Sequence, residues 1–500
     1  MSVLIVGGGI AGLSTALFLS HHGVPCTVVE RHPDLLIHPR ARGLTSRTME
    51  LYRQAGLERA ILGAAYAGSD FTWIPVQADT LNDDEYTSPD EPQEDDGSGA
   101  SPCGFGPIDQ DKLEIIVRDR ARELGADLRF NTELRDFEQD ENGVTATVVD
   151  RATGERQTLT ADYLVAADGF HSPIRQRLGI EVDGPGPMFT TLTAIVDADL
   201  TPAVRGRAAT IAYLQQPRPY TMIMAHDMEG RRWVFGTGFD DSKESIEDYD
   251  DERIVAMVRT AAGLPDAEVR LRPQIPGTDH KVLAFPIGAH IARRYREGRV
   301  FLAGDAAHVW PPTGGLGANA GIQDAHNLAW KLAWVIKGQA GPGLLDTYDA
   351  ERRPTGMATM GQALARFGTR MGPGEGPEII DYGSIAMGYR YPAEGGSADP
   401  SPVLPRLLDG EPGTRAPHVE LPDGTSTLDR YGSRFVLLTA EPGWKSDEVD
   451  VHQVGREVAA AHGIDPSGVV LVRPDGFVAW RSLTASAADL DAALARILRR

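Results

Sequence analysis

The first thirty residues constrain the fold of this chain more than any other stretch. An apolar run at residues 3–6 leads directly into the glycine-rich segment Gly7 to Gly12, a helical pattern follows to about His22, and a second apolar run ends at Glu30. In such a pattern the glycines permit a tight turn, close approach of a pyrophosphate, and close packing of helix on strand. The helix N-terminus favours an anion, and Glu30 is placed to bind an adenosine ribose. The sequence therefore predicts a Rossmann-like site for the ADP part of NAD or FAD.

Composition excludes several classes of partner. The 500 residues carry 49 basic and 71 acidic side chains, a formal charge of −22, and such a surface repels nucleic acid and anionic membranes. No apolar run reaches the ~18 residues of a membrane span, and no basic leader precedes the first strand. The two cysteines, Cys26 and Cys103, are too few for a disulfide framework. We therefore expect a cytoplasmic protein without a metal site that is a monomer or a homodimer.

The remaining sequence alternates in character along its length. Helical patterns begin near Ser46 and span 109–124, and residues 127–164 contain hairpin signals. Strands dominate from about 184 to 291, and among them 221–225 and 232–236 form an expected hairpin. Long helices are predicted from near Asn319 and over 344–367. A Gly- and Pro-rich stretch at 372–405 is typical of a linker, and the last hundred residues are predicted to form a small αβ domain.

Two later motifs decide between NAD and FAD. Asp168 to Arg175 fits the pattern DGxxSxxR, and Gly304 to His308 reads GDAAH. With the opening glycines, the chain resembles the single-component FAD-dependent aromatic hydroxylases, and within them the polyketide hydroxylases of the aklavinone and angucycline type. The resemblance implies that NADPH or NADH binds transiently and reduces bound FAD, and that O₂ then forms a C4a-hydroperoxide that hydroxylates an aromatic small molecule. It covers nearly the whole chain.

The resemblance also implies roles for individual residues. Asp305 would bind the ribityl chain, Arg42 and Gln110 would contact the sugar and phosphate part of FAD, and residues 311–319 would wrap the isoalloxazine. A helix that starts near Asn319 would point its positive end at the flavin, where reduced flavin carries negative charge. The cofactor-binding residues predicted in this way are Gly7, Gly9, Ile10, Ala11, Gly12, Glu30, Arg31, Arg42, Gln110, Asp168, Arg175, Gly304, Asp305, Pro312, Gly315, Gly317, Ala318 and Asn319.

The aromatic and apolar character of the 220–236 hairpin favours a substrate pocket there, although core packing explains the same pattern equally well. The residues assigned to this pocket are Phe71, Trp73, Tyr220, Met222, Met224, Trp233, Phe235, Pro312 and Gly314. No catalytic base stands out. Tyr220, His226 and Arg218 are the candidates, and each is as well explained by a structural role.

The resemblance implies an α/β fold with three parts. A Rossmann-like, para-hydroxybenzoate-hydroxylase-like FAD domain of the GR2 type would comprise 1–68, 106–180 and 291–372, and a mixed β-sheet substrate domain would comprise 69–105 and 181–290. A linker at 373–405 would precede a thioredoxin-like domain at 406–500. Because that last domain has no cysteine, dithiol exchange is impossible there. We expect it to serve structure or oligomerisation, and its deletion to affect solubility or assembly more than the flavin spectrum.

Three other functions share parts of this pattern. Residues 72–75 (TWIP) match half of the WxWxIP motif of flavin halogenases, but the first Trp is missing. A Baeyer–Villiger or epoxidising monooxygenase would use the same cofactor. A flavin-binding assembly partner without catalysis is the third alternative, and the intact motifs at 168–169 and 304–305 weigh against it.

Overall fold

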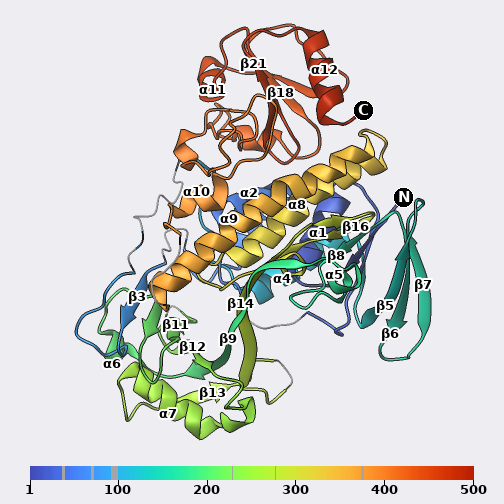
Figure 1. The fold of residues 1–500 in the computed structure, drawn as a ribbon. Helices are drawn as coiled ribbons and strands as arrows, with labels where there is room; N and C mark the ends of the chain where they lie inside the picture. Colours follow the sequence, from blue (N-terminus) through green and yellow to red (C-terminus); the bar gives the residue numbers. More distant parts are fainter. Residues whose placement is uncertain are drawn as a thin grey trace.

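A computed structural model describes residues 1–35, 40–68, 73–89, 91, 99–227, 229–275, 278–372 and 377–500. Figure 1 shows a central pair of long helices, α8 (Leu316–Ile336) and α9 (Asp346–Arg370), with a small domain packed on one side and sheets on the other. None of the helices among these residues combines the length and the apolar character needed to cross a bilayer.

The opening stretch forms the centre of a six-stranded sheet with the order β15-β16-β8-β1-β2-β4. Strand β1 pairs in parallel with both β2 and β8, so that Val3 lies between Cys26 and Tyr163. Helices α4 and α8 both pack against α1. The elements are β1 (Val3–Val6), α1 (Ile10–His21), β2 (Cys26–Val29), α4 (Gln110–Glu123), β4 (Asp127–Arg129), β8 (Tyr163–Ala166), β15 (Arg296–Glu297) and β16 (Val300–Leu302). This is the predicted Rossmann-like layer.

Three short helices and one small sheet complete this domain. The hairpins predicted over 127–164 are confirmed as a three-stranded antiparallel sheet, and the helix expected from Ser46 begins at that residue. The elements are α2 (Ser46–Gln54), α3 (Glu58–Gly63), β5 (Thr132–Gln139), β6 (Val144–Asp150), β7 (Arg156–Ala161) and α5 (Pro173–Arg177).

A second, mixed sheet has the order β17-β14-β9-β12-β11-β10-β3, with β13 paired to β9. Helix α7 (Asp251–Ala262) covers one face of it (Figure 1), where Ile254 and Val258 pack with the sheet's buried side chains. The remaining elements are β3 (Pro75–Ala78), β9 (Val182–Asp197), α6 (Thr201–Val204), β10 (Ile211–Leu214), β11 (Thr221–Ala225), β12 (Arg232–Phe239), β13 (Arg270–Arg272), β14 (Val282–Ala292) and β17 (His308–Val309). The opposite face of this sheet is directed at α9.

The C-terminal part is a four-stranded sheet, β19-β18-β20-β21, with helices at its sides. Its elements are β18 (Val436–Thr439), β19 (Asp450–Gln453), α11 (Arg456–Ala461), β20 (Val469–Val472), β21 (Val478–Ser482) and α12 (Ala487–Ile497). The stretch before it, predicted to be a linker, is described over residues 377–405. That stretch contains α10 (Tyr382–Met387) and buries Tyr389 and Tyr391 against Phe477. The remaining domain boundaries stay our proposal.

Candidate flavin and substrate site

The glycine turn shows why each glycine is needed. Gly7 has a φ of +110°, and a Cβ there would lie 2.1 Å from the carbonyl oxygen of Ala167. A Cβ on Gly12 would lie 2.0 Å from the carbonyl oxygen of Gly7. Gly9 differs, because a Cβ added to it meets nothing within 4 Å. The first and third glycines are therefore required by the protein's own packing, whereas Gly9 borders open space at the N-terminus of α1.

Glu30 is held beside this turn. Its Oε2 atom accepts a hydrogen bond from the backbone N–H of Gly8 at 2.6 Å, and its Oε1 atom accepts one from the backbone N–H of His32 at 2.8 Å. The carboxylate thus lies at the end of β2, beside the helix N-terminus, where an adenosine ribose is expected. Arg31, which follows it, is exposed.

The GDAAH motif forms a 3₁₀ turn, Gly304–Ala306, that packs tightly against two helices. Gly304 has a φ of +60°, and a Cβ there would lie 2.8 Å from the Cβ of Ala11 on α1. A Cβ on Gly321 of α8 would lie 3.1 Å from the Cα of Gly304. The glycine turn, the GDAAH motif and α8 therefore meet at one point.

Asp305 points away from this packing. Its side chain is exposed, although both neighbouring residues are buried. The protein that surrounds it nevertheless raises the pKa of its carboxyl by desolvation, and the charges of His308 and Arg40 oppose that rise. Because the side chain is exposed, its carboxylate oxygens remain free to accept hydrogen bonds from a ligand such as a ribityl chain.

Helix α8 begins three residues before the predicted start. Its N-cap is Gly315, at a φ of +65°, and no side chain caps its free N–H groups. Pro312 and Gly315 are exposed, and Gly317 and Ala318 are half-buried. Uncapped N–H groups at an accessible helix N-terminus form a ready anion site, so the predicted orientation of this helix toward a flavin fits the geometry.

The side chain of Asn319 makes three hydrogen bonds within the protein, and its predicted part in cofactor binding stays a prediction. Its Nδ2 group donates to the carbonyl oxygens of Gly315, at 2.9 Å, and Gly43, at 3.3 Å. Its Oδ1 atom accepts from the backbone N–H of Thr45 at 3.0 Å. The side chain therefore joins the start of α8 to the loop before α2.

Arg42 is also committed to protein contacts. Its guanidinium donates to Asp109 Oδ1 at 2.8 Å, to the carbonyl oxygen of His226 at 2.8 Å, and to that of Ala225. It is buried, and it joins the Rossmann-like domain to the end of β11. These contacts hold the guanidinium in the protein, and the contact of Arg42 with FAD stays a prediction. Arg40, two residues earlier, is the arginine whose charge acts on Asp305.

Gln110 supports the same loop from α4. Its Oε1 atom accepts from the backbone N–H of Ala41 at 3.1 Å, and its Nε2 group donates to Glu114 at 2.7 Å. Glu114 also pairs with Arg40 at 3.2 Å. Neither Glu114 nor Arg40 was among the predicted site residues, although Glu114 lies in the helix predicted over 109–124. Through these contacts Gln110 positions the loop of residues 40–44, which carries Arg40 and Arg42.

The DGxxSxxR motif supports the GDAAH turn. Asp168 accepts hydrogen bonds from the Ser172 hydroxyl at 2.6 Å and the Ile174 N–H at 3.1 Å, and thereby orders the start of α5. Arg175 donates to the carbonyl oxygen of Ala306 at 2.9 Å. The two motifs that indicated FAD are therefore joined directly. Arg175 is hydrogen-bonded to the Gly304–Ala306 turn, and Asp168 orders the helix that carries Arg175.

The substrate sheet separates the predicted pocket residues onto two faces. Residues paired across strands share a face, and Ile223 pairs with Phe235 whereas Met222 pairs with Gly236. Trp233 and Phe235 lie in the core under α7, so their assignment to the pocket is wrong. Met222 and Met224 are half-buried on the opposite face. Trp73 is half-buried before β3, and Phe71 lies outside the described residues.

A cavity of about 530 Å³ lies beside the residues that precede the first residue of β11. Tyr220 lines it and stacks on Phe189 at 4.7 Å between ring centroids, and both rings stack on Phe367 of α9. Arg218 also lines the cavity, but its guanidinium donates to Glu244 at 2.8 Å and to the hydroxyl of Tyr249 at 3.2 Å. The cavity is bordered by Pro187, Met188, Phe239 and Pro286.

The three candidate bases do not form one group. Tyr220 and Arg218 lie at one end of β11 and His226 follows its other end, roughly 20 Å away at ~3.3 Å per residue. Burial lowers the pKa of His226, and the charge of Arg42 lowers it further, so the ring is neutral at pH 7. Arg218 cannot accept a proton in its ion pair.

The donors and acceptors at this site fit FAD. Open space borders Gly9, the Asp305 carboxylate is exposed, and the N-terminus of α8 has no side-chain cap. With Glu30 beside the glycine turn, these features indicate a dinucleotide-binding flavoprotein.

Comparison with known proteins identifies the family. A family model described as "FAD binding domain" matches residues 1–363, and one described as "Aromatic-ring hydroxylase, C-terminal" matches 409–500. Tetracenomycin A2 monooxygenase-dioxygenase of Streptomyces glaucescens is 42% identical over 100% of this chain and 97% of its own length. The 4-methyl-5-nitrocatechol 5-monooxygenase of a Burkholderia species is 39% identical, covering 99% and 96%.

A solved structure agrees with these relatives. The complex of aklavinone-11 hydroxylase with FAD and aklavinone superimposes with a TM-score of 0.89 at 35% identity, covering 100% of this chain and 99% of that one. The chain belongs to the FAD-dependent aromatic hydroxylases, a family of flavoprotein monooxygenases. The predicted fold class, enzyme class and bound cofactor are thereby confirmed.

The glycine turn allows a matched pair of variants. Gly9→Ala places a methyl group where the protein has nothing within 4 Å, at an ordinary φ of −78°, whereas Gly12→Ala drives one into the Gly7 carbonyl. We expect Gly9→Ala to leave the melting temperature of the apoprotein unchanged and to weaken FAD binding by about tenfold or more, because the methyl group occupies the space of the pyrophosphate. Gly12→Ala should lower both. Calorimetry and FAD titration measure these effects, and undiminished FAD affinity in Gly9→Ala would contradict the assignment.

Proposed function

We propose that this FAD-dependent hydroxylase acts on a planar, fused-ring phenol of the polyketide type. The observation that carries the proposal is the 530 Å³ cavity beside the stacked rings of Phe189, Tyr220 and Phe367. Ligand pockets of about 300–1,000 Å³ enclose molecules of several fused rings, and aromatic side chains favour flat ligands through stacking. The names of the tetracenomycin and aklavinone relatives support the same substrate class.

The residues of the flavin site have distinct tasks in this proposal. Asp305 would accept hydrogen bonds from ribityl hydroxyls, Glu30 would accept them from the adenosine ribose, and Arg40 would neutralise phosphate charge. When bound, FAD would supply the redox chemistry, with NADPH or NADH as the reductant and O₂ as the oxidant. The N–H groups at the start of α8 stabilise negative charge on the ring system, which favours its reduction.

The substrate sheet has to exclude water and orient the ring. Met222 and Met224, on the face opposite α7, supply an apolar and adaptable surface. Gly236 and Gly238 make room for the side chains of Met222 and Tyr220 on this face, because a Cβ at Gly236 would lie 2.9 Å from the Met222 methyl and one at Gly238 would lie 3.1 Å from the Tyr220 Cβ. Exclusion of water protects the activated oxygen from wasteful release. An electron-rich phenol is reactive enough that placement of its ring is the main demand on these residues.

Substrate-dependent oxidation of NADPH tests the proposal. Holoenzyme is mixed with NADPH or NADH, O₂ and either tetracyclic phenols or a single-ring catechol, and the products are analysed by mass spectrometry and NMR. We expect fused-ring phenols to accelerate NAD(P)H oxidation and to gain one hydroxyl group. A preference for the single-ring catechol would overturn the substrate class, and a lactone or epoxide product would overturn hydroxylation. Absence of NAD(P)H oxidation with every aromatic compound would favour a non-catalytic flavoprotein.

A further inference from the structure

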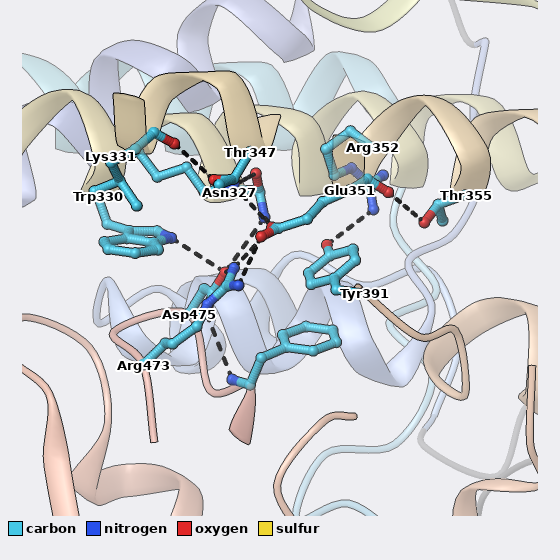
Figure 2. A network of polar contacts seen from close by, with 12 residues as sticks. Asn327, Trp330, Lys331, Thr347, Glu351, Arg352, Thr355, Tyr391, Arg473 and Asp475 are labelled. Atoms are coloured by element: carbon cyan, nitrogen blue, oxygen red, sulfur yellow. Dashed lines mark hydrogen bonds and ion pairs between the residues drawn. The ribbon is translucent and has the colours of Figure 1, made fainter. Parts of the chain in front are cut away.

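A turn of the C-terminal domain is inserted between helices of the FAD-binding domain. Figure 2 shows Arg473 pointing at Glu351 on α9, to which its guanidinium donates two hydrogen bonds of 2.8 and 2.9 Å. Lys331 of α8 donates to the same carboxylate at 2.8 Å. All three side chains are buried. Arg473 and Lys331 lower the pKa of Glu351 to about 2 against the opposing effect of burial, so the carboxylate is fully ionised.

Asp475, on the same turn, extends the contact to two more helices. Its Oδ2 atom accepts hydrogen bonds from the Trp330 indole at 3.1 Å and the Asn327 amide at 3.3 Å, both on α8. Its carbonyl oxygen accepts one from Arg47 of α2 at 2.6 Å. The turn is therefore anchored on α2, α8 and α9. Helix α2 begins at Ser46, just after the loop that carries Arg40 and Arg42. Helix α8 begins at Leu316, within the 311–319 segment that is predicted to wrap the isoalloxazine.

A second path leaves this turn through two aromatic rings. Phe477 stacks on Tyr391 with centroids 4.2 Å apart and planes inclined by 26°. The hydroxyl of Tyr391 accepts a hydrogen bond from Arg352 at 3.2 Å, and Arg352 also donates to Asp324 at 2.7 Å (Figure 2 shows the tyrosine and the arginine). Arg352 thus has Tyr391, which stacks on Phe477 of the C-terminal domain, on one side and α8 on the other.

Asp324 is the last residue of this path, and it is hydrogen-bonded to the GDAAH segment that carries Asp305. Its Oδ2 atom accepts from the backbone N–H of Gly304 at 3.2 Å and contacts His308 Nε2 at 2.7 Å. Gly304 and His308 are the first and last residues of the GDAAH motif, so both ends of the segment that carries Asp305 are tied to one carboxylate. Burial opposes its ionisation, but Arg352 and His308 lower the pKa of Asp324 below its usual range.

We propose that the C-terminal domain supports the geometry of the FAD site. Through its contact with Tyr391, it acts on Arg352 and Asp324, and these three positioning residues fix Asp305 for the ribityl chain. Each is buried and hydrogen-bonded to the next, so displacement of one leaves the others with an uncompensated charge or donor. The Gly304 turn also packs directly on Ala11 and Gly321, which leaves it no room to move independently of α8.

A pair of tyrosine variants tests this role. Tyr391→Phe keeps the ring stacked on Phe477 and removes only the hydroxyl that accepts from Arg352. Tyr431→Phe removes the hydroxyl of an equally buried tyrosine in the core of the C-terminal domain, 3.5 Å from His462 and outside this path. We expect Tyr391→Phe to raise the dissociation constant of FAD by about tenfold, because a buried guanidinium loses an acceptor. Tyr431→Phe should change it less than about twofold, even where it lowers the melting temperature equally.

Asp324→Asn provides a second measurement of the same path. The amide keeps the shape of the carboxylate but replaces one of its acceptor atoms with a donor, so Gly304, His308 and Arg352 cannot all be satisfied. We expect FAD affinity to fall further than in Tyr391→Phe. Dissociation constants are measured by titrating apoprotein with FAD, and melting temperatures by calorimetry of the same samples. FAD affinity unchanged in Tyr391→Phe, or lowered to the same extent in Tyr431→Phe, would overturn the proposal and leave the C-terminal domain with a purely architectural role.

Discussion

Removal of residues 409–500 is expected to abolish soluble, FAD-containing protein. Arg415 of the C-terminal domain pairs with Glu50 of α2, and Arg473 with Glu351 of α9, and all four side chains are buried. Removal of one partner from a buried ion pair costs roughly 3–5 kcal/mol, so these two losses together approach the total stability of many domains, about 5–15 kcal/mol. The yield of soluble protein and its flavin absorbance measure the outcome.

Apolar contacts across the same boundary add to this expectation. Trp330 and Trp334 of α8 pack edge to face on Phe435, with centroid distances of 5.8 and 5.1 Å. Truncation would expose both indoles to water, which favours aggregation. This replaces the expectation that deletion leaves the flavin spectrum largely intact.

Single substitutions in the full chain separate the interface from the domain. Arg415→Met, which leaves Glu50 with Arg47 alone, should lower the melting temperature markedly. Arg481→Met is the matched control, because that guanidinium donates to the carbonyl oxygens of Asp409 and His462 within the C-terminal domain. Soluble 1–408 protein with a normal flavin content would contradict the structural argument.

Local rules explain which parts of the site were predictable. The demand on Gly12 could be interpreted from sequence, because a Cβ there meets the carbonyl oxygen of Gly7 only five residues earlier, whereas the demand on Gly7 comes from the distant Ala167. The GDAAH and DGxxSxxR motifs indicated FAD only through their resemblance to the aromatic hydroxylases. Their direct contact through Arg175 and the Ala306 carbonyl joins residues 131 positions apart, and no local pattern indicates such a contact.

Strand register explains the errors in the substrate sheet. Alternation along a strand predicts that Trp233 and Phe235 share a face, and that Met222 and Met224 share one. It does not predict which of these pairs lies on the face covered by α7. The register, in which Ile223 pairs with Phe235, puts these two residues on the same face. The hairpin was therefore predicted correctly, while its two aromatic residues were assigned to the wrong side.

Charged residues show the same dependence on distant partners. The sequence does not distinguish the roles of Arg40 and Arg42. Asp109, which lies 67 positions away, pairs with Arg42 and thereby commits it to a contact within the protein. The Gly- and Pro-rich composition of 377–405 likewise favoured an exposed linker. Its tyrosines are buried because Phe477, which follows a hairpin turn late in the chain, packs on them.

Asp305→Ala is expected to remove FAD from the purified protein. The carboxylate is exposed and has no hydrogen-bond partner among the described residues, so we expect it to serve binding rather than folding. Loss of charged hydrogen bonds to ribityl hydroxyls should weaken FAD binding by roughly ten- to a hundredfold. Gel filtration followed by the absorbance ratio of flavin to protein measures retention, and full occupancy of the variant would contradict the assignment. Asp305→Asn, which keeps an acceptor oxygen, should lose less affinity.

The apoprotein of these variants should respond to pH in a defined direction. Desolvation raises the folded-state pKa of the Asp305 carboxyl above its unfolded value, so the folded state binds this proton more tightly than the unfolded chain does. That contribution to stability is present at acidic pH and is lost as pH rises through the folded-state pKa. Asp305→Asn removes the penalty of holding the charge in the empty site. The melting temperature of its apoprotein should therefore exceed that of the wild type at pH 7, and the difference should shrink toward pH 4. A difference that grows on acidification would mean that the protein stabilises the ionised carboxylate, contrary to a site that depends on the ribityl hydroxyls to solvate it.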